Sequence, residues 1–171
     1  MHKYLKTLFN ICLLREGPEK LPHSYVLLGL VAAISFSVSV YIGSIDYSVS
    51  FAGLSSIAIL FFSFLFTKLL LLKKPERFLQ TFSAMLGADA IITTMSIPSF
   101  YSLTYLKLGE IAQIFFSLTI FALFIWAVIV YGYIFSKALS SQMGFGLALS
   151  VSYALLGNFI FSLFLAGNTS T

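Results

Sequence analysis

Long apolar segments constrain this chain more than any other feature of its sequence. Several stretches of about twenty residues are almost free of charge, which is the length that an α-helix needs to cross ~30 Å of hydrocarbon. Of the 171 residues, 59% are hydrophobic and only 9% are charged, whereas a water-facing surface needs roughly 25–35% charged residues. The sequence therefore predicts an all-α, polytopic transmembrane helix bundle and argues against a soluble enzyme.

Five spans are expected within a single transmembrane helical domain that covers residues 22–167. The third is the least apolar, since it contains Gln80, Asp89 and several hydroxyl side chains, and it is expected to stop at Pro98. Four spans remain if this segment does not cross. The expected spans are residues 25–43, 49–72, 78–97, 111–135 and 144–166.

Residues 1–21 are expected to form a cytoplasmic, interfacial amphipathic helix followed by an elbow. Apolar side chains fall on one helical face and polar side chains lie off it. Gly17, Pro18 and Pro22 then interrupt the helix, because proline lacks the N–H donor. A cleaved signal peptide is the competing interpretation, but no small-x-small cleavage site follows the apolar stretch. The apolar face contains Tyr4, Leu5, Leu8, Phe9 and Cys12.

Lysine and arginine residues near the span ends predict the orientation. With five spans and a cytoplasmic N-terminus, nine of the ten lie inside and only Lys107 lies outside. With four spans Lys137 replaces Lys107 as the outside residue, so charge does not decide the number of spans. The expected protein is integral to a membrane, the inner membrane for a bacterial chain, and five spans place the short tail of residues 168–171 outside.

The last two expected spans carry a resemblance to a known family. Trp126 lies within residues 124–132, a short polar turn is expected at residues 135–138, and small residues recur in residues 144–150. In this layout the chain resembles the Yip family of small five-span membrane proteins, as a short member of the bacterial type. The resemblance implies a cytosolic N-terminus and, from the eukaryotic relatives, contact with Rab-type GTPases in vesicle traffic.

Asp89 is the main candidate for a functional side chain, because it lies ~17 Å along the third helix, near the middle of a bilayer. An ionised carboxylate costs roughly 2.5–3.5 kcal/mol there, so such an acid is a functional hypothesis by default. No Lys or Arg lies at matching depth, which favours a neutral acid that donates a hydrogen bond to Asn158, Thr93 or a tyrosine. The group either binds a proton or cation or joins two helices. Asn158 has the same alternatives, with the structural one favoured.

Basic side chains near the N-terminus and after the second span form a candidate lipid or partner patch. Such charges attract anionic lipid by about 1 kcal/mol each near the surface. The competing interpretation is that they only determine the topology. The residues of this patch are Lys3, Lys6, Lys73, Lys74 and Arg77.

Small residues spaced four apart predict close helix contacts, more often within the chain than between copies. Gly132 with Ser136 and Gly146 with Ser150 are two of these pairs. Seven tyrosines, Tyr131 among them, lie near expected span ends. They are interpreted as anchors at the membrane interface.

Motifs of catalysis and metal binding are missing from the sequence. It contains no HExxH, no GxSxG, no CxxC and no phosphate loop, and it has one cysteine and two histidines. No enzyme, cofactor, metal site or nucleic-acid partner is therefore expected.

Two classes of function remain. One is a non-enzymatic component that binds another membrane or membrane-associated protein, organises the membrane or assists trafficking. The other is a small-solute or proton-coupled transporter or channel component centred on Asp89.

Overall fold

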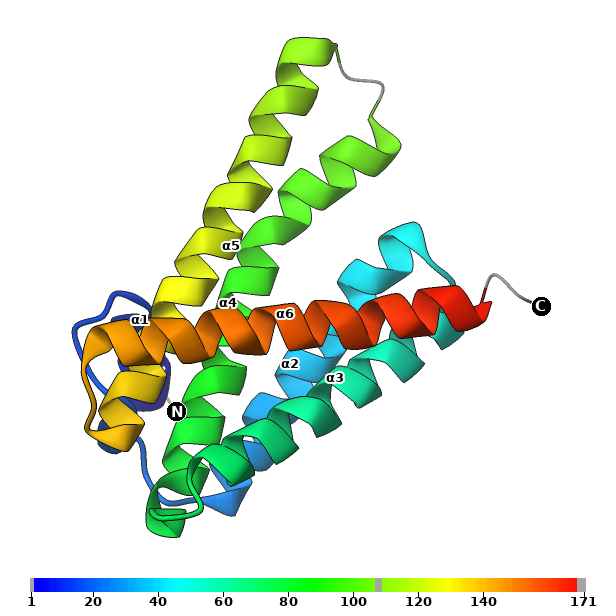
Figure 1. The fold of residues 1–171 in the computed structure, drawn as a ribbon. Coiled ribbons are helices and arrows are strands. Elements are labelled where there is room, and N and C mark those ends of the chain that lie inside the picture. The colour runs from blue at the N-terminus through cyan, green and yellow to red at the C-terminus, as the bar shows by residue number, and fades with distance from the viewer. Residues whose placement is uncertain (1, 107–108, 169–171) are drawn as a thin grey trace.

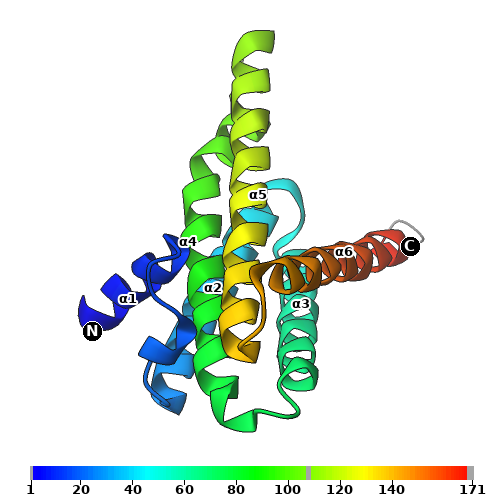
Figure 2. The ribbon, with the colours of Figure 1, turned by 60° about the vertical axis from the view of Figure 1, so that its left-hand side comes forward.

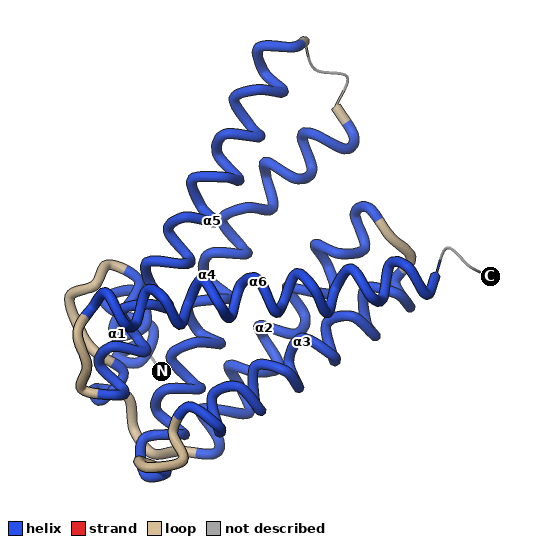
Figure 3. The backbone as a smooth tube through the Cα atoms, viewed as in Figure 1, coloured by secondary structure: helices blue, strands red, loops and turns tan. Residues whose placement is uncertain are grey.

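The computed structural model describes residues 2–106 and 109–168, and this part of the chain consists of helices joined by short loops, without a strand (Figure 1, Figure 3). The predicted all-α helix bundle is confirmed. In chain order the elements are α1 (His2–Cys12), η1 (Pro18–Lys20), α2 (Tyr25–Asp46), α3 (Val49–Leu70), η2 (Pro75–Arg77), α4 (Phe78–Tyr105), α5 (Glu110–Leu139) and α6 (Met143–Asn168).

Four of the described helices are long and apolar enough to cross a membrane, namely α2, α3, α5 and the Met143–Ala166 part of α6. These helices identify an integral membrane protein. Helix α4 is not among the four, although its 28 residues reach ~42 Å. Its serine, threonine and aspartate side chains lower its hydropathy, and other helices cover it, since twelve of its residues are buried.

Helix α4 continues through Pro98 to Tyr105, so the expectation that this segment stops at Pro98 is wrong. Proline removes one backbone donor, but a transmembrane helix tolerates this loss where hydroxyl side chains and neighbouring helices satisfy the backbone. The carbonyl oxygen that loses its helix donor to Pro98 is that of Thr94, and the Oγ1 of the same residue donates one turn back, to the carbonyl oxygen of Ala90 at 2.6 Å. The extended helix reaches the end of α2, where the Oγ1 of Thr104 donates to Asp46 at 2.9 Å.

Helix α6 crosses α5 steeply (Figure 2), and the two backbones come close at Gly132 and Gly146. A Cβ atom on Gly132 would lie 2.8 Å from a methyl carbon of Leu147, and one on Gly146 would overlap the carbonyl oxygen of Gly132. Small residues permit this approach. The predicted close helix contact within the chain is confirmed for the Gly132 and Ser136 pair, which meets Gly146 of the second pair. The turn expected at residues 135–138 is helical instead, because α5 continues to Leu139.

Helix α1 packs beside the middle of α4 rather than beside its end. Leu8 lies so close to Gly87 that a Cβ atom added to Gly87 would lie 2.5 Å from the Cδ2 of Leu8. The indole Nε1 of Trp126 on α5 donates to the carbonyl oxygen of Cys12 at 3.1 Å. The expected apolar face is therefore divided, with Leu8 and Cys12 buried and the remaining members partly exposed. Those exposed residues are Tyr4, Leu5 and Phe9.

Candidate functional site

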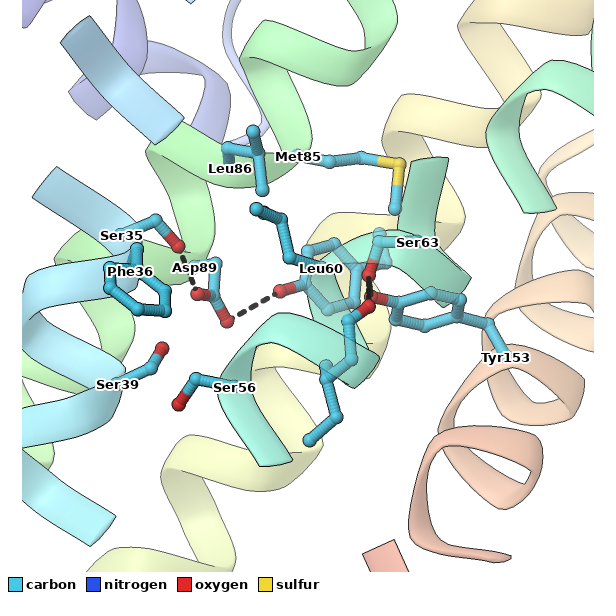
Figure 4. Close-up of a pocket in the computed structure, with 12 residues that line it drawn as sticks. Ser35, Phe36, Ser39, Ser56, Leu60, Ser63, Met85, Leu86, Asp89 and Tyr153 are labelled. Carbon is cyan, nitrogen blue, oxygen red and sulfur yellow. Dashed lines mark hydrogen bonds between the residues drawn. The ribbon is translucent and has the colours of Figure 1, made fainter. Parts of the chain in front are cut away.

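Asp89 accepts hydrogen bonds from two other helices (Figure 4). The Oγ of Ser35 on α2 donates to its Oδ2 at 2.6 Å, and the hydroxyl of Tyr131 on α5 donates to its Oδ1 at 3.1 Å. Asp89 lies ~4 Å from the midpoint of the 28-residue α4. The expectation that it faces other helices is confirmed, and a tyrosine is one of its partners, but Tyr131 rather than Asp89 is the donor in that hydrogen bond.

A cavity of about 60 Å³ adjoins the Asp89 carboxyl group. Since one water needs roughly 10–15 Å³, this space is large enough for a few water molecules or a small hydrated ion. Asp89 is only partly covered, because one side of it faces this cavity. All five long helices contribute to the polar lining, which consists of Ser35, Ser39, Ser56, Ser63, Asp89, Tyr131 and Tyr153.

A second hydroxyl pair borders the same cavity. The hydroxyl oxygens of Ser63 on α3 and Tyr153 on α6 lie 2.6 Å apart. Ser63 donates its single proton to the carbonyl oxygen of Ile59 at 2.7 Å, so Tyr153 is the donor in the pair. The rings of Tyr131 and Tyr153 meet edge to face at 5.5 Å. The tyrosines therefore connect the Asp89 group to α3 and α6.

The arrangement can hold a proton or a small cation. None of the described residues that line the cavity is Lys, Arg or His, so Asp89 has no cationic side chain beside it there. A carboxylate together with hydroxyl oxygens and water is a set of oxygen ligands of the kind that hard cations prefer. Residues 2–106 and 109–168 contain no cluster of three His, Cys, Asp or Glu side chains, as a multi-ligand metal site would require.

Two of the residues expected beside Asp89 lie elsewhere. Asn158 is exposed on α6, and its Nδ2 donates to the carbonyl oxygen of Ala154 at 3.0 Å, one turn back in its own helix. Pairing with Asp89, the less favoured of its two expected roles, is not made, because the Asn158 side chain lies on the exposed surface of α6. Thr93 lies one turn beyond Asp89 on α4 and is half-buried, but it does not line the cavity.

Most of the hydroxyl groups of the site are not predicted from the sequence. Tyr131 was interpreted as an interfacial anchor because α5 was expected to end at residue 135, whereas α5 extends to Leu139 and Tyr131 is buried. Tyr153 could have been predicted to bond to another helix, since a hydroxyl group in the middle of an apolar span requires a partner. The sequence does not single out Ser35 and Ser63 as site residues, because helical serines commonly donate to their own backbone.

Two of the basic residues of the predicted lipid or partner patch, Lys74 and Arg77, contact the end of α5, and a role of the patch in binding lipid or a partner stays a prediction. The Nζ of Lys74 donates to the carbonyl oxygen of Leu139 at 2.9 Å, and an Nη of Arg77 donates to that of Ala138 at 3.0 Å. Both cations therefore cap the carboxyl end of α5, where the helix dipole favours positive charge. Lys6 and Lys73 remain exposed at separate places. The side chain of Lys3 lies outside the described residues.

No family model, curated protein or solved structure matches this chain. The resemblance to the Yip family therefore stays a prediction.

Proposed function

We propose that this multi-pass membrane protein is non-enzymatic and binds a proton or a small cation at Asp89, as a transporter or channel component. One observation carries the proposal. Each carboxyl oxygen of Asp89 accepts a hydrogen bond from a hydroxyl group of a different helix, beside a cavity of about 60 Å³ that five helices line. Acids at such positions in membrane helices serve in proton relays and ion pathways.

The hydroxyl partners suit a group that gains and loses a proton. A hydroxyl group both donates and accepts, so Ser35 donates to an ionised Asp89 and accepts from a protonated one after its own hydrogen has rotated. Tyr131 has the same capacity. Since these partners lie on α2 and α5, a change of proton or cation occupancy at Asp89 alters contacts between three helices.

Flux into vesicles tests this function. The full chain is reconstituted in vesicles with a trapped pH dye, and proton entry is compared with that of empty vesicles. We expect Asp89→Asn to abolish the difference and Tyr131→Phe to reduce it. Asp46→Asn is the matched control, because Asp46 lies at the end of α2 and bonds to Thr104 instead. Protein-containing vesicles that pass protons, sodium and potassium no faster than empty vesicles would contradict the proposal.

A partner-binding, membrane-organising or trafficking accessory role of the Yip type is the second candidate. The free end of the α4–α5 hairpin supports it, since α5 extends past the other helices there (Figure 1) and exposes large side chains such as Phe115, Leu118 and Phe121. This surface offers contact to a helix of another membrane protein. A cytoplasmic N-terminus, as the basic residues predict, would place Lys6 and Lys73 within reach of a cytosolic partner.

Affinity purification in mild detergent distinguishes the two candidates. A stoichiometric partner that is retained by Asp89→Asn and lost by Leu118→Glu would support the accessory role. A solitary protein whose vesicle flux depends on Asp89 would support the transport role. Leu156→Glu on α6 is the matched control, because Leu156 is similarly exposed at 46% but lies away from the hairpin.

A further inference from the structure

An apolar groove of about 580 Å³ lies between α1, α2 and α4 and shares no lining residue with the Asp89 cavity. Phe9 forms part of the α1 wall, Leu30 and Ile34 part of the α2 wall, and Met95 part of the α4 wall. Three of these side chains, Phe9, Ile34 and Met95, are 46–50% exposed. The described residues leave this groove unfilled.

The length of the groove fits one leaflet of a bilayer. It follows α2 from Ser24 to Ile34, and ten residues of helix span ~15 Å. Half of the ~30 Å hydrocarbon core has the same thickness. Because α2 is one of the four helices able to cross a membrane, hydrocarbon chains are what surrounds this groove.

Charge at the Ser24 end favours a negative headgroup. Pro22 and Ser24 line the groove there. His23, which lies between them in sequence, and Lys20, two residues before Pro22, are both exposed. Residues 1–24 carry four Lys and Arg against two Glu. Basic side chains at a membrane surface attract anionic lipid.

We propose that the groove holds one acyl chain of an anionic phospholipid, with its headgroup beside Lys20 and His23. The lipid completes the packing around α1, because it covers the apolar side chains of α1 that α4 does not cover. This site is independent of the proton or cation site at Asp89, so either can fail without the other.

Lipid retention tests the proposal. The full chain in mild detergent is incubated with an equimolar mixture of phosphatidylglycerol and phosphatidylcholine that have the same acyl chains, and bound lipid is measured by native mass spectrometry. We expect one bound lipid per chain, with phosphatidylglycerol enriched at least five-fold. Leu30→Trp fills the groove and should lower retention at least five-fold. Leu54→Trp, the same change at an exposed site on α3, should leave retention unchanged.

A second variant leaves the groove open and changes only the charge at its end. Lys20→Glu, at an exposed residue, should keep a bound lipid but lose the preference for phosphatidylglycerol. Equal binding of both lipids by the unmodified chain would overturn the proposal, as would equal loss in the two tryptophan variants. Dimerisation that leaves no bound lipid and is abolished by Leu30→Trp would also overturn it, because a second copy would then occupy the groove.

Discussion

The two halves of α5 are similarly apolar but lie in different surroundings. All seven buried residues of α5 fall between Val130 and Ala138, where α6 crosses it. Before Val130 none is buried, and side chains as large as Ile111 and Phe115 are 86% and 64% exposed. Lipid tails are as apolar as leucine, so hydrophobicity does not distinguish a packed from a lipid-facing segment. Small and polar residues do, because they permit close approach and require partners.

Helix α4 shows the same rule on a larger scale. It is the least apolar of the five long helices by the criteria for spanning a membrane, yet it has the most buried residues. Covered by its neighbours, it keeps polar groups such as Asp89 and Ser83 away from lipid. The comparison between the packed and lipid-facing halves of α5 can be tested by matched substitutions in detergent or bilayers.

The largest effect is expected at the α5–α6 crossing. Gly146→Ala should lower the free energy of unfolding by about 3 kcal/mol, because backbone atoms of Gly132 and Ser136 stand where the new methyl group must go. Gly144→Ala is the control, since nothing lies within 4 Å of its Cβ position, and it should be neutral or slightly stabilising. Denaturant titration in micelles measures both. Equal destabilisation by Gly146→Ala and Gly144→Ala would contradict the close approach of α5 and α6 at Gly146.

A same-residue pair tests the two halves of α5 directly. Ile134 is 0% exposed and Ile114 is 59% exposed. Ile134→Ala should cost about 2 kcal/mol, because it leaves a cavity, although transfer into water contributes little for a chain that unfolds within lipid. Ile114→Ala should change stability by less than about 0.5 kcal/mol. A larger loss from Ile114→Ala would show that the lipid-facing half has a protein partner in the preparation.

A smaller effect is expected where η2 caps the packed end of α5. Arg77→Ala removes hydrogen bonds to the carbonyl oxygens of Lys137 and Ala138 and to the hydroxyl of Ser140. Arg77 is partly exposed, so we expect a loss of about 1 kcal/mol. Lys73→Ala, at an exposed neighbour, should be neutral. Thermal unfolding at low and high salt measures both variants. A loss of stability in Arg77→Ala that becomes larger at high salt would argue against a charged cap at the end of α5.

The last prediction concerns the reactivity of a side chain and leaves stability unchanged. Burial raises the pKa of the Cys12 thiol from 9.0 to about 11. Only the thiolate reacts, so labelling by a maleimide at pH 8 should be about 100-fold slower than for a thiol of ordinary pKa. The rate should rise about ten-fold per pH unit up to pH 11. Leu13→Cys in a Cys12→Ser chain is the comparison, since Leu13 is 53% exposed. Equal rates at pH 8 would mean that α1 detaches.

The sequence predicts the helices of this fold better than their ends or their crossing angles. Apolar length identified α2, α3, α5 and α6, since that property is local. The end of α4 could not be predicted from Pro98, because its tolerance depends on neighbouring helices. The steep crossing of α6 was equally hidden, although the glycines that permit it were recognised as contact residues.

The candidate site was predictable at its centre and not at its edge. Asp89 was identified because an intramembrane acid is expensive and therefore rare. Its partners Ser35 and Tyr131 could not be distinguished from other hydroxyl residues, because only the packing of α2 and α5 brings them to the carboxyl group. Asn158 satisfied every sequence criterion and still lies outside the site, since the direction of α6 turns it to the surface.

The hydrogen bond between the indole of Trp126 and the carbonyl oxygen of Cys12 makes the fluorescence of Trp126 a reporter of whether α1 is packed against α5. The chain has a single tryptophan, so its tryptophan emission, excited at a wavelength that tyrosine does not absorb, comes from this contact without any label. Release of α1 would shift the emission to longer wavelength where water replaces it and to shorter wavelength where hydrocarbon does. The sign of that shift would therefore show whether α1 packs against α5 at the aqueous interface or within the hydrocarbon of the membrane.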